Sequence, residues 1–243
     1  GRIAFEQQHY LQAVRLYGRV MSSRYLVSAQ LNISRLYTLL KDPETALNHL
    51  QQFAENYPKY AFDVLPAQAR LLISMDRQTD ALEVYDRALL YKPDKESLLL
   101  ARGSLFESVG QLKNAINDFR RAVDVAPDSA LALNALGYTL ANKTYRYREA
   151  YRYTKRALAL DPDNAAVIDS MGWVQYRRGR LTDALTYLER AHALMPDPEV
   201  SAHLGEVLWV QGDREAAEQI WNQALQEHPD SPALNKTMLR FNP

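Results

Sequence analysis

The chain has 243 residues, and its 29 Lys and Arg residues balance 29 Asp and Glu residues, so no net field favours a nucleic acid or an anionic membrane. It holds no cysteine, which excludes disulfides, thiol nucleophiles and thiolate metal sites. Its nine glycines are few for a loop-rich fold, and the composition therefore favours helices.

Four kinds of residue recur along the chain with nearly constant spacing. A first alanine recurs in steps of 33 to 35 residues, at Ala46, Ala81, Ala115, Ala150, Ala184 and Ala217. Each of the last five of these alanines is followed, seven residues later, by a second alanine. A proline comes five residues after that second alanine. Each of the last four of the first alanines is preceded by a glycine twelve or thirteen residues earlier, at Gly103, Gly137, Gly172 and Gly205. This pattern is typical of the tetratricopeptide repeat (TPR), a hairpin of two helices, A and B.

Each recurring residue has a physical reason. We predict that the glycine of helix A faces the first alanine of helix B, where a larger side chain would cost about 1–3 kcal/mol of overpacking strain. The proline ends helix B because it cannot continue a helix. Asp197-Pro198 and Ser231-Pro232 are predicted to begin helices as a capping residue followed by proline. Glycines in left-handed conformation are predicted to end helix A at Gly110, Gly179 and Gly212.

In chain order, the pattern predicts a truncated repeat, six complete repeats and a closing helix. The ranges are 1–26 for the truncated repeat, then 27–60, 62–95, 96–129, 130–164, 165–197 and 198–231, and 232–243 for a C-terminal capping helix. Gly1 falls where the glycine of helix A belongs, so we expect the natural protein to continue upstream. The predicted fold is an all-α, right-handed superhelical TPR solenoid, with helix A on the inner, concave wall and helix B outside.

The inner wall of the first three complete repeats is predicted to be polar and mixed in charge. Its residues are Leu31, Arg35, Thr38, Asp63, Arg70, Ile73, Ser97, Ser104 and Glu107. None of them matches the Lys/Asn/Arg set with which some chaperone-linked TPR proteins hold a C-terminal carboxylate. Arg35 and Arg70 could bind an anionic group, although arginines on a solvated wall give the same pattern.

The last three repeats are predicted to carry an aromatic partner-binding wall. Helical spacing places its residues on one face of each helix A: Asn134, Tyr138, Asp169, Trp173, Tyr176, Arg177, His203, Glu206 and Trp209. Aromatic rings beside hydrogen-bonding groups suit an extended peptide, because rings offer large contact area with little entropy to lose. The alternative is that these rings pack between neighbouring A helices.

A run of arginines and tyrosines from Tyr145 to Arg156 raises the question of nucleic-acid binding. The run lies mostly on a predicted helix B, where tyrosines would pack between hairpins and arginines would face solvent. Glu149 interrupts it, and Asp161 and Asp163 dilute its charge. We therefore expect a solvated outer face with no nucleic-acid partner, and keep a docking patch for an acidic partner as the alternative.

Catalysis finds little support in the residue pattern. His203 and Glu206 lie one helical turn apart and could supply part of a metal site, but no second cluster completes it. There is no glycine-rich phosphate loop and no nucleophile paired with a base. We expect neither an enzyme nor a bound cofactor, and a metal-dependent hydrolase is the last of the alternatives.

From about Leu131 to Leu225 the amino-acid sequence of the repeats resembles a family that is narrower than TPR proteins in general. The segments that carry the resemblance are Leu133–Ala141, Ala157–Asp163, Asp169–Val174, Pro196–Val200 and Ala202–Trp209. Together they resemble the C-terminal repeats of bacterial outer-membrane TPR lipoproteins, a family that includes the lipoprotein binding partner of the periplasmic carboxyl-terminal processing protease. Residues before 130 resemble only divergent TPRs.

The resemblance implies an adaptor on the periplasmic side of the outer membrane. Such an adaptor binds the processing protease, activates it and presents cell-wall hydrolases for degradation. The resemblance also implies a membrane anchor on a lipidated N-terminal cysteine, which this chain lacks. The alternative function is a general peptide-binding or complex-assembly scaffold.

Overall fold

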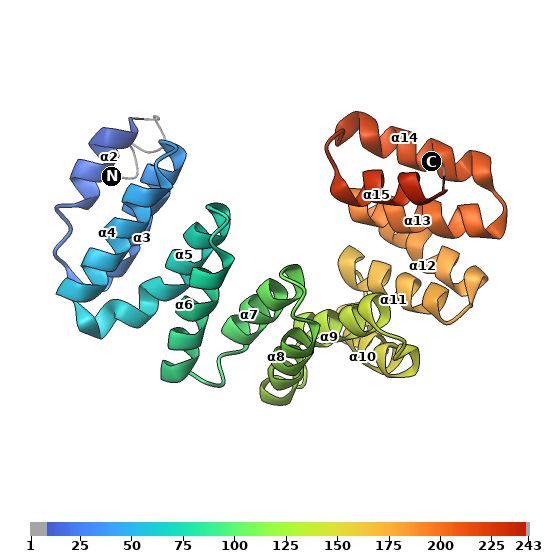
Figure 1. Ribbon diagram of the computed structural model, residues 1–243, viewed down its shortest axis with the longest axis horizontal. Coiled ribbons are helices and arrows are strands. Elements are labelled where there is room, and N and C mark those ends of the chain that lie inside the picture. The colour runs from blue at the N-terminus through green and yellow to red at the C-terminus, as the bar shows by residue number, and fades with distance from the viewer. Residues whose placement is uncertain (1–8, 242–243) are drawn as a thin grey trace. The chain divides into compact units, whose positions relative to one another are not determined.

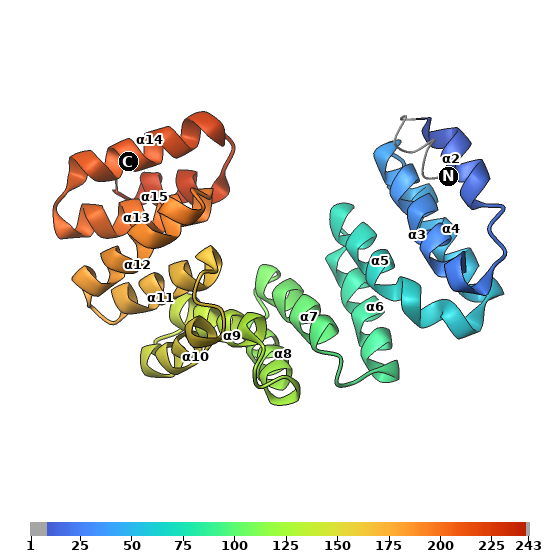
Figure 2. The same cartoon turned by 180° about the vertical axis from the view of Figure 1, so that it is seen from behind.

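The structure, a computed structural model, describes residues 9–241, and every regular element in that range is a helix. The chain divides into two units, Gly1–Gln111 and Leu112–Pro243. Figures 1 and 2 show the helices of each unit from opposite sides. Antiparallel hairpins follow one another along each unit, and this confirms the predicted all-α solenoid. No helix among the described residues is both long and apolar enough to span a membrane.

The first unit contains two complete hairpins. Helix α3 pairs with α4, α5 pairs with α6, and α2 packs on α3 through the buried residues Ala13 and Leu36. Helix α2 is the described part of the predicted truncated repeat, whose residues 1–8 lie outside the described range. The elements are α2 (Tyr10–Tyr17), α3 (Ser23–Leu39), α4 (Pro43–Asn56), the short 3-10 helix η1 (Pro58–Tyr60), α5 (Ala61–Ser74), α6 (Gln78–Tyr91) and α7 (Glu96–Ser108).

The second unit contains three hairpins and a closing helix. Helices α9, α11 and α13 are the A helices of these hairpins, and each contacts the next one along the chain. Helix α15 packs against α13 and α14. The elements are α8 (Leu112–Val125), α9 (Ala130–Lys143), α10 (Tyr147–Leu160), α11 (Ala165–Arg177), α12 (Leu181–Leu194), α13 (Pro198–Gln211), α14 (Arg214–Glu227) and α15 (Pro232–Phe241).

The recurring alanines are buried among the helices, as their spacing predicts. The first alanine is fully buried at all six of its positions, and of the second alanines only Ala224 has measurable exposure, at 7%. The helix A glycine lies against the first alanine, as predicted: a Cβ added to Gly172 would lie 3.2 Å from the carbonyl oxygen of Ala184, and one added to Gly137 would lie 3.2 Å from that of Ala150. The side chain one helical turn further along helix B lies closer still. A Cβ added to Gly172 would lie 2.7 Å from Cγ of Leu188, and one added to Gly205 would meet the indole of Trp221.

Leu188 and Trp221 each come four residues after the first alanine of their helix. Side chains on a helix lean towards its N-terminus, so these residues cover the turn that holds the alanine. Thr154 takes the same place opposite Gly137, with its methyl carbon 2.6 Å from where a Cβ would lie. Its buried hydroxyl donates to the carbonyl oxygen of Ala150 at 3.1 Å, so the polar atom in this apolar position is satisfied.

Left-handed residues end the A helices where the sequence predicts them. Gly110, Gly179 and Gly212 have φ values of 78°, 77° and 107°. Lys41 and Asp76 adopt the same conformation, at 59° and 61°, in the turns after α3 and α5. Side chains with a Cβ pay a steric cost there that glycine does not.

The closing helix α15 begins at Pro232 and packs against the last hairpin. Ser231 precedes Pro232, and its hydroxyl accepts a hydrogen bond from the backbone N–H of Leu234 at 3.4 Å. Leu234 is fully buried in a cluster with Trp221, and Phe241 packs against that cluster. Helix α15 therefore covers the apolar face that the last hairpin would otherwise expose.

Candidate partner-binding site

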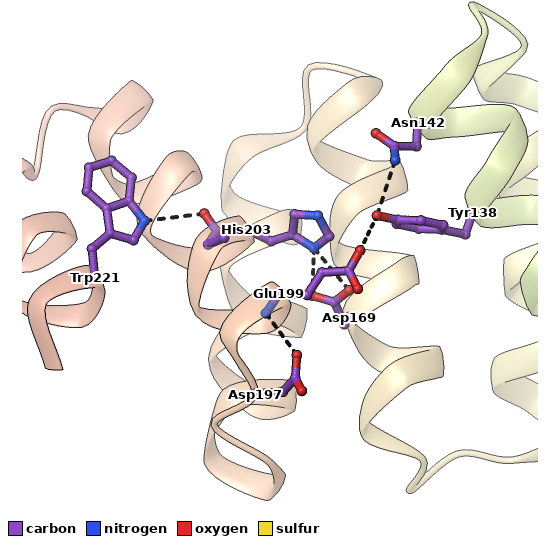
Figure 3. Close-up of polar contacts among 8 residues, drawn as sticks. Tyr138, Asn142, Asp169, Asp197, Glu199, His203 and Trp221 are labelled. Carbon is purple, nitrogen blue, oxygen red and sulfur yellow. Dashed lines mark hydrogen bonds and ion pairs between the residues drawn. The ribbon is translucent and has the colours of Figure 1, made fainter. Parts of the chain in front are cut away.

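A buried histidine–aspartate pair joins two neighbouring A helices of the second unit. Asp169 lies on α11 and His203 on α13, and Nδ1 of His203 is 3.0 Å from both carboxylate oxygens of Asp169. Figure 3 shows the imidazole pointing into the carboxylate. His203 is 8% exposed and Asp169 5% exposed, so the contact is made almost entirely out of water. We call the side chains of α9, α11 and α13 gathered around this pair the A-helix wall.

Aromatic rings enclose His203. The indole of Trp173 stacks on the imidazole with ring centroids 4.1 Å apart and planes inclined by 21°. Tyr138 lies on another side of the imidazole at 6.0 Å, and Tyr176 packs against Trp173 at 5.2 Å. Trp173 is only 5% exposed, so its ring packs between A helices and offers a partner little surface.

Carboxylates favour the protonated form of His203 in this enclosed place. Burial by itself would lower the pKa of His203, but Asp169, which also accepts its hydrogen bond, together with Glu199 and Glu206 raises that pKa above its usual value. The stacked indole favours the same charge, because the face of an aromatic ring attracts a cation. The pair therefore favours the protonated form of His203.

A second polar link spans the wall at its exposed edge. The hydroxyl of Tyr138 on α9 donates to Oε1 of Glu199 on α13 at 2.6 Å, and the side-chain amide of Asn142 donates to the same hydroxyl at 3.2 Å. Figure 3 shows this chain of contacts beside the His203–Asp169 pair. Glu199 is exposed, so the Tyr138–Glu199 contact is within reach of a partner.

Glu206 and Tyr176 belong to a third group of contacts, which reaches the closing helix. Burial, followed by the charge of Glu206 and a hydrogen bond to it, raises the pKa of Tyr176 to about 12. Glu206 also forms an ion pair with Arg240 of α15. The carboxylate of Glu206 is therefore shared between a phenol and a guanidinium.

Arg177 and Asn134 lie at the borders of the wall. The guanidinium of Arg177 donates to the hydroxyl of Tyr147 on α10 at 2.9 Å and lies 5.9 Å from the ring centroid of Trp173. Asn134 is half-buried, and its side-chain oxygen has no hydrogen-bond partner within residues 9–241.

Trp209 does not belong to the A-helix wall, and this corrects the sequence prediction. Its ring stacks on Trp221 of α14 at 5.7 Å and lies 6.1 Å from the ring of Phe241 of α15. Trp209 therefore packs in the C-terminal cluster together with Phe241 of the closing helix. The sequence places Trp209 at the correct helical position, but it does not show that Phe241 would pack against it.

Among the described residues, these groups form no candidate metal site. Within residues 9–241 there is no group of three His, Cys, Asp or Glu side chains that could hold a metal ion. His203 and Glu206, the pair considered as part of a metal site, have different partners, Asp169 and Arg240. What remains accessible is a polar and aromatic edge held in place by buried contacts.

Sequence reasoning missed the Tyr138–Glu199 link and the role of Arg240. One signal in the sequence could have predicted the Asp169–His203 contact, because these residues are 34 positions apart, which is about one repeat period. Residues one period apart occupy similar positions on successive A helices, which is where neighbouring helices meet. Tyr138 and Glu199 are 61 apart, and no such rule connects them.

Comparison with known proteins agrees with the repeat pattern. Family models of the tetratricopeptide repeat match residues 28–60, 100–165 and 175–239. A TPR repeat-containing protein of Pseudomonas aeruginosa is 38% identical over 206 residues, which cover 85% of this chain and 35% of that protein. The chain thus spans about a third of that relative's length.

Solved structures show the same fold. A thermophilic TPR protein of Thermus thermophilus superimposes with a TM-score of 0.64 at 21% identity, covering 74% of this chain and 97% of that one. A tetratricopeptide repeat protein of Parabacteroides merdae superimposes with a TM-score of 0.72 at 16% identity, covering 88% of this chain and 86% of that one.

Proposed function

Because the chain belongs to the tetratricopeptide repeat family, we propose that it is a non-catalytic scaffold that binds other proteins along its A helices. The observation that carries this proposal is the A-helix wall. Helices α9, α11 and α13 contact one another in turn, and the Tyr138–Glu199 hydrogen bond lies at their exposed edge. Aromatic and hydrogen-bonding groups fixed on rigid helices are suited to holding an extended segment of a partner.

More specifically, we propose an adaptor for a periplasmic carboxyl-terminal processing protease. The support is the resemblance of Leu131–Leu225 to the repeats of outer-membrane TPR lipoproteins. In this proposal a lipid anchor outside the present chain holds the protein on the periplasmic side of the outer membrane, and cell-wall hydrolases are the substrates presented. Binding protease and substrate together raises their effective concentration, which accelerates cleavage without a catalytic group on the scaffold.

Reconstitution with a purified processing protease and a cell-wall hydrolase tests the proposal. We expect the scaffold alone to cleave nothing, to bind the protease, and to raise the rate of hydrolase degradation when added to it. A full-length scaffold that neither binds nor stimulates the protease would remove the adaptor proposal. Recovery of a different protein assembly in pull-downs, without a protease, would favour a general assembly scaffold.

A matched pair of variants tests the role of the wall. Tyr138→Ala removes the ring and the hydroxyl that link α9 to Glu199, and we expect it to weaken partner binding about tenfold, as interface tyrosines often do. Tyr153→Ala on α10 removes a half-buried tyrosine from a helix B and serves as the control. Equal effects of the two variants would argue against binding at the A-helix wall.

A further inference from the structure

A groove opens on the first unit, between the A helices α3 and α5, both labelled in Figure 2. Its volume is about 520 Å³. Leu31 and Leu39 of α3 and Leu71 of α5 give it apolar surface. Arg35 of α3 and Arg70 of α5 also line it. The groove lies wholly within one unit and is separate from the A-helix wall.

The two arginines occupy equivalent positions in consecutive repeats, 35 residues apart. Both side chains are exposed, and neither forms an ion pair or a hydrogen bond with another residue in the range 9–241. Other arginines of the same unit do have partners: Arg77 pairs with Asp80 and Arg102 with Asp86. The groove therefore holds two guanidinium groups whose charge is not compensated by a described neighbour.

The rest of the lining lacks negative charge. No Asp or Glu is among the residues that line the groove. Hydroxyl groups line it instead, and those of Ser28, Thr38 and Ser74 donate to carbonyl oxygens of their own helices at 2.9, 3.1 and 2.7 Å. Their oxygen atoms keep lone pairs that can accept hydrogen bonds from the backbone N–H groups of a ligand.

We propose that this groove binds an extended acidic segment of a partner protein. Two carboxylate side chains of the segment pair with Arg35 and Arg70, since a guanidinium presents several N–H donors in the geometry that a carboxylate accepts. Aliphatic side chains of the segment lie on the leucines. Side chains two residues apart in an extended strand share a face and are about 6.6 Å apart, so such a strand presents two carboxylates on one side.

The lining favours a peptide over a phosphate-bearing ligand. A phosphate group needs donors on several sides, whereas the hydroxyl groups here already donate within the protein and remain as acceptors. A free phosphate would bury no apolar surface on the leucines, whereas the aliphatic side chains of a peptide would bury such surface and so stabilise the complex. This inference does not depend on the protease proposal, because it concerns the groove of the first unit alone.

Direct titration of the purified chain with labelled peptides tests the proposal. The probe is a short amidated peptide with two Glu residues two positions apart, flanked by Leu and Val, and its control carries Gln in place of Glu. We expect the Glu peptide to bind, the Gln peptide to bind about tenfold more weakly, and the affinity for the Glu peptide to fall with added salt.

Variants locate the binding. The double variant Arg35→Gln, Arg70→Gln is expected to weaken binding of the Glu peptide about tenfold, while Arg35→Lys, Arg70→Lys keeps part of it. The control variant Arg15→Gln, Arg24→Gln makes the same charge change at exposed arginines that do not line the groove. Circular dichroism melting checks that all three variants remain folded.

Three results would overturn the proposal. The first is equal binding of the Glu and Gln peptides. The second is an equal effect of the groove variant and the control variant. The third is binding that requires a free C-terminal carboxylate, inorganic phosphate or anionic vesicles instead of the acidic side chains. Because no protease enters this assay, its failure leaves the adaptor proposal to its own test.

Discussion

Replacing Asp169 by asparagine should destabilise the second unit in a pH-dependent way. The change keeps the size of the side chain and removes the charge that faces His203 across 3.0 Å. Hydrogen bonds to charged groups contribute about 1.5–3 kcal/mol, and losing one partner of a buried pair can cost more. His203 can release its proton, and the asparagine oxygen can still accept from Nδ1–H, so we expect a loss of about 2 kcal/mol near pH 6.

The sign of the pH dependence follows from the raised pKa of His203. A group that binds its proton more tightly in the folded state stabilises that state fully below its unfolded pKa, here 6.5. This contribution is lost as the pH rises through the higher folded value. Asp169→Asn removes a source of the raised pKa, so the difference from wild type should be largest below pH 6.5 and should shrink at alkaline pH.

Urea unfolding followed by tryptophan fluorescence is the suitable assay. All three tryptophans, Trp173, Trp209 and Trp221, lie in the second unit, so the signal reports on the unit that holds the pair. Asp163→Asn is the control, because the Asp163 side chain is 86% exposed and its pairing with Arg190 lies at the surface. A loss equal to that of the control, or one that grows with pH, would refute the reasoning.

Four further substitutions probe the packing. Gly205→Ala places a methyl group on the buried indole of Trp221, and strain of about 1–3 kcal/mol should outweigh a helix-propensity gain of up to about 1 kcal/mol; unfolding that stays unchanged would contradict the close approach. Lys41→Gly should stabilise the first unit by about 0.5 kcal/mol, since a left-handed lysine is replaced by a residue that tolerates this conformation. Gly179→Ala should cost the second unit about 1 kcal/mol for the opposite reason, and equal signs for the two changes would be inconsistent with the turn geometry. Trp173→Ala should cost about 3–5 kcal/mol by urea unfolding, because the ring is buried; a small loss of stability with a large loss of binding would instead place the ring in the binding surface.

The fold could be predicted because its determinants are small residues at a fixed spacing. Ala150 and Ala184 have to be small wherever the helices cross, so their recurrence identifies the hairpins. The spacing does not tell which side chain fills the crossing. Gly172 lies against the carbonyl of Ala184 as expected, but the side chain that approaches it most closely is that of Leu188, which leans back over the alanine.

The candidate site could be predicted only as a set of residues on one side of the A helices. Asp169, Trp173 and His203 were correctly placed in one region, but their burial depends on how closely α11 approaches α13. A helical wheel divides a helix into faces, and it does not reveal how far the neighbouring helix extends over each face. Trp209 was misplaced for a related reason, since Phe241 of the closing helix packs beside it.

The buried charges of the second unit act on its exposed edge through helix placement. Buried polar groups are costly to leave without a partner, so sliding α11 past α13 would separate His203 from Asp169 at a large cost. Fixing α13 in this way also fixes Glu199 opposite the hydroxyl of Tyr138. A partner that meets side chains already held in place loses less conformational entropy on binding than one that must order them. If the proposed binding takes place at this edge, the buried pair supports it without touching the partner.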